Sequence, residues 1–273
     1  MQKSKAIGIA FLFLSFLTVA VKAQKADLMN SKKTYVFIHG SWHSAWNWFR
    51  VTPILEKQGN KVYSIDLPAM GRDKTPVGEV RFDKTVKIIC NLLDSINGKV
   101  ILVGHSKNGV LISQVAEYRP DKIEKLVYLA AVLAQNGKCA ADYFKLDTEE
   151  VLGAHITFDE KTQSSMLLPE IYKEGLYHDC DDEITEMAKV ILSPEPRQTA
   201  YTPISITEKN YGRVPRYYIE CTEDRAISIS LQRKMFAEMP CRKIYSMATS
   251  HSPFFSKPKE LCDILVEIAS LQK

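Results

Sequence analysis

Short apolar runs alternate with amphipathic stretches along most of the chain. The apolar runs predict strands near residues 33–39, 61–66, 99–104, 124–131, 216–221 and 242–247. Helical patterns lie between and after them, near residues 46–58, 84–96, 107–118, 228–238 and 257–271. This alternation predicts an α/β fold in which helices cover both faces of a mostly parallel sheet.

The alternation stops between Val132 and about Val214. Within this insertion we expect Val151–His155 to be extended, and residues 169–177 and 182–192 to be helical. An insertion after the fourth strand is expected to form a lid that shapes a pocket and excludes water. Its apolar candidates, most of which are expected only to pack the lid on the core, are Met166, Leu167, Leu168, Leu176 and Tyr177.

A serine lies where the third predicted strand meets a helix. The segment Lys99–Gly109 runs a β-branched apolar stretch into a glycine-rich turn with Ser106 at its apex. A strand that turns at once into a helix strains the apex residue and lifts its hydroxyl clear of the sheet. This context makes Ser106 the predicted nucleophile.

A serine nucleophile needs a base, which follows it in the order serine, acid, histidine in open α/β sheets. His251 lies in the loop between the last predicted strand and the last helix, and such loops carry the chemistry. We therefore predict that His251 is the base. The other histidines either precede the serine or lie in the polar insertion: His39, His43, His105, His155 and His178.

The carboxylate that orients the imidazole should also follow a strand end. The predicted strand Arg216–Cys221 is followed by two acids, Glu223 and Asp224. Asp224 is the predicted partner of His251, and Glu223 is the alternative. No acid follows the preceding strand, so the other common location for this carboxylate is empty.

Two backbone N–H groups should face the oxyanion that forms when serine attacks a carbonyl. One is expected from Lys107, the residue after the nucleophile. The other is expected from Ser41, because Gly40 allows a tight turn after the first strand. His39 is expected to hold this loop by hydrogen bonding rather than to act in catalysis.

Several short motifs occur together, and in the same order, in one known family. They are His39–Trp46, Asp66–Gly71, Gly104–Ser106, Leu176–Cys180, Tyr218–Asp224 and His251. With them the chain resembles the plant methylesterase and hydroxynitrile lyase branch of the α/β-hydrolases from about residue 33 to its end. The resemblance implies the α/β-hydrolase fold with a lid insertion at about residues 132–214.

By this resemblance, Ser106, Asp224 and His251 take the family's triad positions. The backbones of Ser41 and Lys107 take its oxyanion-hole positions. The implied activity is hydrolysis of a small carboxylic ester through an acyl-enzyme, without a cofactor or a metal ion.

The lyase members of the branch differ from the esterases at two positions. They place a lysine directly after the triad histidine, where this chain has Ser252, and a threonine where this chain has Gly40. Both positions therefore favour ester hydrolysis. A C–C lyase acting on cyanohydrins and a slowly reacting small-molecule binding protein are the alternatives.

Two residues depart from the family pattern at the serine turn. Asn108 replaces the first glycine of the usual Gly-x-Ser-x-Gly-Gly, so a larger side chain is expected where strand and helix pack closely. Lys107 replaces a residue that is generally apolar. Its ammonium group is expected either at the pocket mouth, where it would favour anionic esters, or in water.

The first 23 residues have the pattern of a cleaved secretory signal. A basic start, Met1–Lys5, precedes the apolar run Ala6–Val21, and Val21–Ala23 supplies the small residues that a signal peptidase requires. The run is shorter than the roughly 20 residues of a membrane-spanning helix. We therefore expect an exported protein, periplasmic or secreted, whose residues 24–273 form one catalytic domain.

Charge excludes one class of partner. Removing Lys3, Lys5 and Lys22, with no acidic residue, lowers the formal net charge from +4 to +1. A nearly neutral chain argues against nucleic-acid binding. No spacing typical of metal ligands or dinucleotide binding occurs, so the expected partner is a small ester, and a homodimer remains open.

The chain has six cysteines, which an exported protein could oxidise. Cys180, Cys221 and Cys262 fall where the resembling plant enzymes also carry cysteine, and we expect them to be buried thiols. Cys139, together with Cys180, is left as a possible disulfide in the lid.

Overall fold

The structure is a computed structural model that describes residues 32–272, so the predicted signal peptide lies outside the described residues. Its centre is a six-stranded parallel sheet in the order β2-β1-β3-β4-β8-β9. The strands are β1 (Thr34–Ile38), β2 (Lys61–Ser64), β3 (Val100–His105), β4 (Ile123–Leu129), β8 (Arg216–Cys221) and β9 (Lys243–Met247). All six predicted strands are confirmed, with ends that differ by at most two residues.

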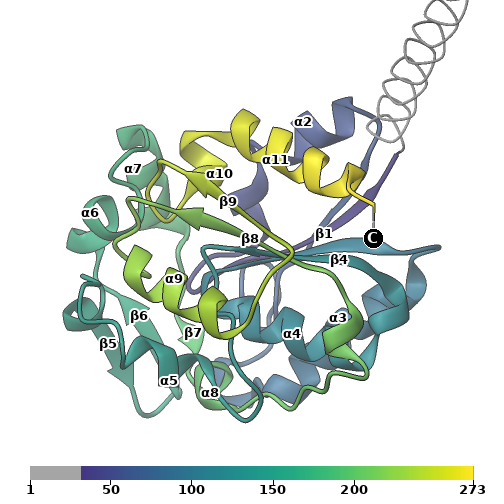
Figure 1. Ribbon diagram of the computed structural model, residues 1–273. Helices are drawn as coiled ribbons and strands as arrows, with labels where there is room; N and C mark the ends of the chain where they lie inside the picture. Colours follow the sequence, from purple (N-terminus) through teal and green to yellow (C-terminus); the bar gives the residue numbers. More distant parts are fainter. Residues whose placement is uncertain (1–31, 273) are drawn as a thin grey trace, which may run out of the picture.

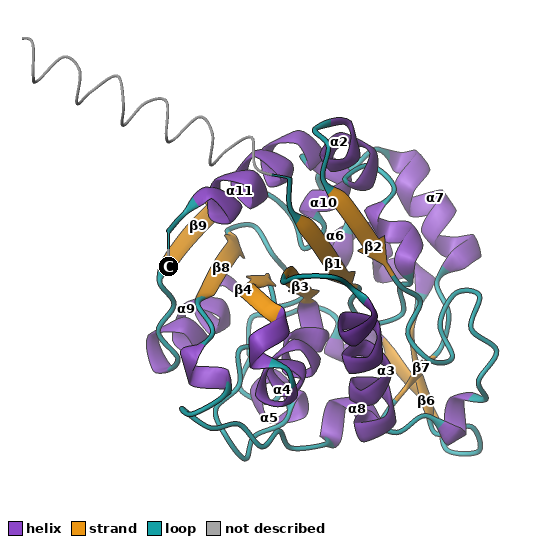
Figure 2. Cartoon of the chain, turned by 90° about the vertical axis from the view of Figure 1, so that its right-hand side faces the viewer, coloured by secondary structure: helices purple, strands orange, loops and turns teal. Residues whose placement is uncertain are grey.

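Helices cover both faces of this sheet (Figures 1 and 2). One face carries α3 (Phe82–Ser95), α4 (Gly109–Tyr118) and α9 (Ile229–Glu238). The other carries α2 (Thr52–Lys57), α10 (Pro253–Ser256) and α11 (Pro258–Ser270). The predicted helix at 46–58 is divided, because a 3-10 turn, η1 (Ala45–Trp48), precedes the short α2.

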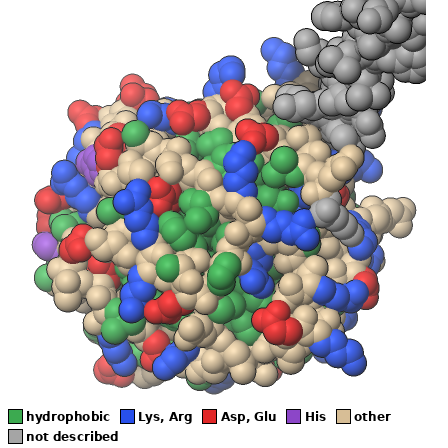
Figure 3. Space-filling view, in the orientation of Figure 1, with side chains coloured by type: hydrophobic (Ala, Val, Ile, Leu, Met, Phe, Trp, Pro, Cys, Tyr) green, Lys and Arg blue, Asp and Glu red, His purple; other side chains and the backbone are tan. Residues whose placement is uncertain are grey.

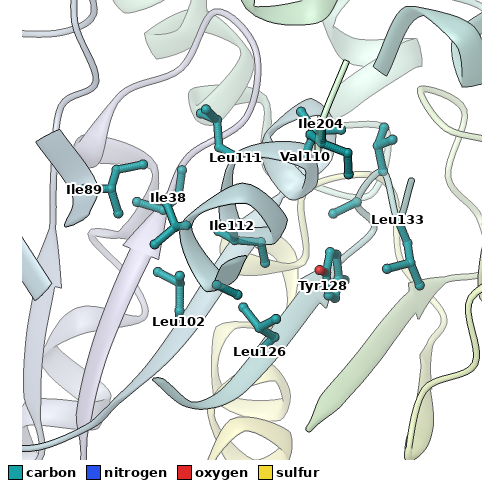
Figure 4. Close-up of a cluster of buried hydrophobic side chains, with 14 of the residues drawn as sticks. Ile38, Ile89, Leu102, Val110, Leu111, Ile112, Leu126, Tyr128, Leu133 and Ile204 are labelled. Carbon is teal, nitrogen blue, oxygen red and sulfur yellow. The ribbon is translucent and has the colours of Figure 1, made fainter. Parts of the chain in front are cut away.

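The central strands bury both of their faces, which explains their nearly continuous apolar sequences. In β3, Val100 and Leu102 pack toward α3 and α4, whereas Ile101 and Val103 pack toward α2 and α11. Figure 4 shows part of the first of these two cores, where Leu102 lies near Ile112 of α4. The sheet is therefore held rigidly between two apolar layers, and its strand ends are fixed positions for side chains.

The insertion between β4 and β8 forms a separate group of elements at one end of the sheet (Figure 1). A small antiparallel sheet has the order β5-β6-β7. The bounds are α5 (Ala140–Phe144), η5 (Gly153–His155), β5 (Ile156–Asp159), β6 (Ser164–Leu167), η6 (Pro169–Ile171), α6 (Tyr172–Leu176), α7 (Asp182–Ile191), β7 (Glu195–Pro196), α8 (Gln198–Tyr201) and η7 (Tyr211–Arg213).

Two of the three predictions within the insertion are confirmed. Residues 169–177 and 182–192 are helical, in η6, α6 and α7. The prediction that Val151–His155 is extended is wrong, because this segment bends into η5 and the strand begins only at Ile156. The N–H of Val151 donates to the carbonyl of Arg225, which ties the bend to the loop after β8.

The cysteines are free thiols throughout the described chain. Cys180, Cys221 and Cys262 are buried as predicted, and burial raises the pKa of Cys180 to about 12. The disulfide left possible between Cys139 and Cys180 does not form. The Cys139 thiol instead donates to the Asp142 carboxylate at the start of α5. The backbone N–H of Cys139 donates to the same carboxylate at 3.0 Å, and this second bond belongs to a capping box that stabilises α5.

The surface mixes both signs of charge on the face shown in Figure 3. Among residues 32–272, no helix is both long enough and apolar enough to cross a membrane.

Candidate active site

The serine turn has the geometry that the sequence predicts. Ser106 follows β3 directly and has a φ of 58°, a left-handed conformation that few non-glycine residues adopt. Small residues leave room for the turn: a Cβ on Gly104 would lie 2.9 Å from the side chain of Ile112. A Cβ on Gly109 would lie 2.2 Å from the carbonyl oxygen of Val132. Gly109 is thus the residue at which helix and backbone approach most closely.

Ser106, His251 and Asp224 form one hydrogen-bonded series. His251 Nε2 lies 2.9 Å from Ser106 Oγ, and His251 Nδ1 lies 2.7 Å from Asp224 Oδ2. All three side chains are buried, although they come from the ends of three different strands. The imidazole is therefore positioned to take the proton of the serine hydroxyl while the carboxylate fixes its tautomer.

Asp224 is held by several donors besides His251. The backbone N–H groups of Ala226 and Ile227 donate to its Oδ1 at 2.8 and 3.0 Å. Gln232 of α9 donates to its Oδ2 at 3.2 Å. Glu223, the alternative acid, is exposed, and the carboxylate that bonds to the histidine is that of Asp224.

The loop after β1 approaches the serine closely. A Cβ on Gly40 would lie 2.8 Å from the Cβ of Ser106. Ser41 and Lys107 both line the cavity that contains Ser106. Among the loop and side-chain hydrogen bonds within residues 32–272, none is donated by the backbone N–H of Ser41 or of Lys107. These two donors therefore remain available to an oxyanion.

His39 holds this loop, as predicted. Its Nδ1 lies 2.8 Å from the carbonyl of Gly40, and the N–H of Leu67 donates to its Nε2 at 3.2 Å. Burial lowers the pKa of His39 to about 4, so the ring is neutral at pH 7 and can accept this bond. Asn108 adds a further tie, because its side-chain amide donates to the carbonyl of His39 at 2.7 Å. The larger side chain at 108 thus joins the serine turn to the loop of the predicted oxyanion hole.

The remaining histidines bind carbonyls or other rings. His105 Nε2 lies 3.0 Å from the carbonyl of His251, and burial lowers the pKa of His105 well below its usual value. The neutral ring therefore donates to that carbonyl and adds no charge beside the base. His43 bonds to the hydroxyl of Tyr177 at 2.6 Å. Burial lowers the pKa of His43 to about 3.

Ser106 opens into a cavity of about 280 Å³. Its walls are mostly apolar and come from the serine turn, the loop after β1 and the insertion. Among the five apolar lid candidates, Leu176 lines the cavity, whereas Leu167 and Tyr177 are buried in the core instead. Several other residues of the insertion line the cavity without having been predicted to, among them Phe144, Leu152, Ile156 and Phe158.

The expectation that the Lys107 ammonium group lies in water is wrong, because it donates to Glu195 Oε2 at 2.6 Å and to Thr199 Oγ1 at 2.9 Å. Lys107 does line the cavity, as the other expectation has it, but its charge is paired with Glu195. Lys107 and Glu195 are both buried. In the sequence, a lysine beside a buried turn indicates that an acidic partner is needed. The sequence spacing does not identify Glu195 as that partner.

No cluster of three or more side chains within residues 32–272 has a composition suited to a metal ion.

Comparison with known proteins gives a consistent result. Residues 35–264 match the pattern of the "Alpha/beta hydrolase family". Methylesterase 7 of Arabidopsis thaliana is 33% identical over 256 residues, which cover 88% of this chain and 97% of that protein. Putative methylesterase 11, chloroplastic, of the same plant is also 33% identical over 87% of this chain, but the chain spans only 64% of that relative's length.

A solved structure agrees with these sequence matches. The crystal structure of polyneuridine aldehyde esterase has a TM-score of 0.78 and 25% sequence identity to this chain. The match covers 88% of this chain and 100% of that one.

Proposed function

Because the chain belongs to the methylesterase branch of the α/β-hydrolase family, we propose that it hydrolyses small carboxylic esters by serine catalysis through an acyl-enzyme. The observation that carries this proposal is the series from Ser106 Oγ through His251 to Asp224, with contacts of 2.9 and 2.7 Å, beside a largely apolar cavity.

Acylation begins when His251 Nε2 takes the proton of Ser106 as Oγ attacks the ester carbonyl carbon. The π electron pair of the carbonyl moves onto its oxygen and forms the oxyanion, which the N–H groups of Ser41 and Lys107 stabilise. The C–O bond to the alcohol then breaks, and His251 gives the leaving oxygen its proton. The products of this half-reaction are a free alcohol and an ester of Ser106.

Deacylation repeats these steps with water. His251 takes a proton from water as its oxygen attacks the acyl carbon, and Ser106 leaves with the proton returned by the imidazole. Throughout, Asp224 stabilises the imidazolium and holds its Nδ1–H. One ester and one water thus give one acid and one alcohol, and the enzyme is regenerated.

The insertion serves this chemistry as a lid. The side chains of Leu152, Ile156, Phe158 and Leu176 line the cavity above the serine. Such a cover excludes water from the oxyanion and strengthens the electrostatic interactions within the site.

The test is hydrolysis of a panel of methyl, acetyl, aryl and lactone substrates by the wild type and by Ser106→Ala. We expect turnover of several esters by the wild type and a loss on the order of 10⁴- to 10⁶-fold in the variant. Cyanide release from mandelonitrile without ester hydrolysis would instead indicate a lyase. A single burst of product without turnover would indicate a binding protein.

We also propose that the enzyme is exported. The support is the basic, apolar and small-residue pattern of residues 1–23. N-terminal sequencing of the protein purified from its native cells should find a chain that begins at Gln24. A chain that retains the first 23 residues in the cytoplasm would contradict this proposal.

A further inference from the structure

The cavity wall contains a buried ion pair beside the nucleophile. Lys107 comes from the serine turn and Glu195 comes from β7 of the insertion, and both line the cavity with Ser106. Their charged atoms lie 2.6 Å apart, and the side chains are 4% and 9% exposed. Thr199 of α8 accepts a second hydrogen bond from Lys107 at 2.9 Å.

Such a pair is not the simplest way to fill this wall. Removing two charges from water is energetically costly, and apolar side chains of similar size are often at least as stabilising. A pair retained in a binding cavity therefore suggests a role toward what the cavity holds.

The pair leaves both an acceptor and a donor unused. Glu195 bonds to Lys107 through Oε2, and its Oε1 makes no hydrogen bond within residues 32–272. Lys107 uses two of its three ammonium protons, on Glu195 and Thr199. A group that both donates and accepts a hydrogen bond would pair with Glu195 Oε1 and with the third ammonium proton of Lys107.

Three further charged side chains line the cavity: Arg197, Glu150 and Lys145. Arg197 pairs with Glu160 and lies over the ring of Phe158. Glu150 accepts hydrogen bonds from two backbone N–H groups near the start of η5. Lys145 is exposed to solvent, which screens its charge. An anionic substrate would thus find no uncompensated cation at depth, and would lie as close to Glu195 as to Lys107.

We propose that Lys107 and Glu195 form a subsite for a hydroxyl group on a neutral ester substrate. The hydroxyl donates to Glu195 Oε1 and accepts from Lys107 Nζ. Because Ser106, Lys107 and Glu195 line one cavity, the hydroxyl belongs to the same substrate molecule as the scissile carbonyl. The inference rests on the proposed esterase function and names the substrate class of the same site, a neutral hydroxy-acid ester.

The first test uses the wild-type protein and three methyl esters of similar size. Methyl 3-hydroxybutanoate carries the hydroxyl, methyl 3-methylbutanoate replaces it by a methyl group, and monomethyl succinate carries a carboxylate. We expect kcat/KM for the hydroxy ester to exceed both others by at least about tenfold, because the apolar and anionic esters leave buried polar groups unpaired.

The second test changes the charge of the subsite. Glu195→Gln keeps the shape of the side chain and leaves Lys107 as an uncompensated cation. At low salt, the ratio of kcat/KM for monomethyl succinate to that for the hydroxy ester should rise about tenfold or more. Glu186→Gln is the matched control, because Glu186 pairs with Lys189 on the exposed side of α7 and does not line the cavity.

The outcomes separate this inference from the proposed function. Equal kcat/KM for the three esters in the wild type overturns the hydroxyl subsite and leaves the esterase proposal intact, and this holds even if Glu195→Gln does not fold. Unchanged ratios in a folded Glu195→Gln variant overturn it as well. Failure to hydrolyse any of the three esters or 4-nitrophenyl acetate overturns both proposals.

Discussion

Ser106 is held in an unfavourable backbone conformation by contacts on either side of it. A left-handed φ at a non-glycine residue costs on the order of 1–3 kcal/mol, which the surrounding packing has to offset. The N–H of Val132 donates to the carbonyl of Ser106 at 2.9 Å, and Asn108 binds the carbonyl of His39. The position of the hydroxyl is therefore fixed before any substrate binds.

The two acids after β8 should differ sharply in their effect. Asp224→Asn removes the acceptor that fixes the imidazole tautomer, and kcat should fall by about 10⁴-fold. Glu223→Gln should lower kcat less than about twofold, because its side chain is exposed. Steady-state kinetics on one ester measures both, with circular dichroism as the control for folding. A larger loss of kcat in Glu223→Gln than in Asp224→Asn would show that Asp224 is not the acid that orients His251.

At the level of residues, sequence predicts those whose position the chain order determines. Ser106, Asp224 and His251 each follow a recognisable strand, so their meeting at the sheet edge could be expected. The partner of Lys107 could not be predicted in this way, because Glu195 is 88 positions away on a two-residue strand of the insertion. Short elements of this kind leave no periodic signal in the sequence.

The start of α4 packs closely against the segment after β4. The start of α4 is pressed against the backbone at Val132, and Gly109 is the residue that permits it. Parallel strands β3 and β4 are neighbours in the sheet, so any displacement at Val132 reaches the serine directly.

Gly109→Ala should therefore damage both stability and activity. Its Cβ would lie 2.2 Å from the carbonyl oxygen of Val132, and the backbone cannot absorb this without moving the turn. We expect a loss of about 2 kcal/mol or more in the free energy of unfolding, and at least about tenfold in kcat, from urea unfolding and ester kinetics. Gly98→Ala is the comparison, since open space surrounds Gly98 and only its positive φ opposes the change. Equal effects of the two substitutions would refute this role of Gly109.

At the level of elements, the sequence predicts the central sheet far better than the insertion. Continuous apolar runs such as residues 100–105 are buried on both faces and cannot be mistaken for surface strands. In contrast, β5 is mostly exposed and β6 contains two serines, so neither has a clear pattern of alternating burial. The prediction of an extended segment at Val151–His155 fails here. Val151 is fixed by a hydrogen bond to the loop after β8, a contact that no local pattern reveals.

In the molecule as a whole, three neutral histidines are enclosed beside the site. Burial lowers the pKa of His39 to about 4 and of His43 to about 3, and it lowers the pKa of His105 well below the usual value. In the unfolded chain these rings have a pKa of about 6.5. Between the two values the unfolded state binds more protons than the folded state.

The free energy of unfolding should therefore decrease as the pH falls from about 6.5 to about 4, and the full contribution should be present above 6.5. His39→Gln removes one of the titrating groups, so its stability should depend less steeply on pH in this window. Urea unfolding of both proteins across the window measures the two slopes, and the carboxylates contribute equally to each. Parallel slopes would show that His39 is not the buried neutral ring described.

Ser106 is expected to form a covalent acyl intermediate in this cavity. Mass spectrometry of the protein mixed rapidly with 4-nitrophenyl acetate, followed by peptide mapping, tests it most directly. We expect one acetyl group per chain on the peptide that contains Ser106, formed together with a burst of nitrophenol, and no such group in Ser106→Ala. Acetylation of another residue as the reactive intermediate, or full ester turnover by Ser106→Ala, would contradict it.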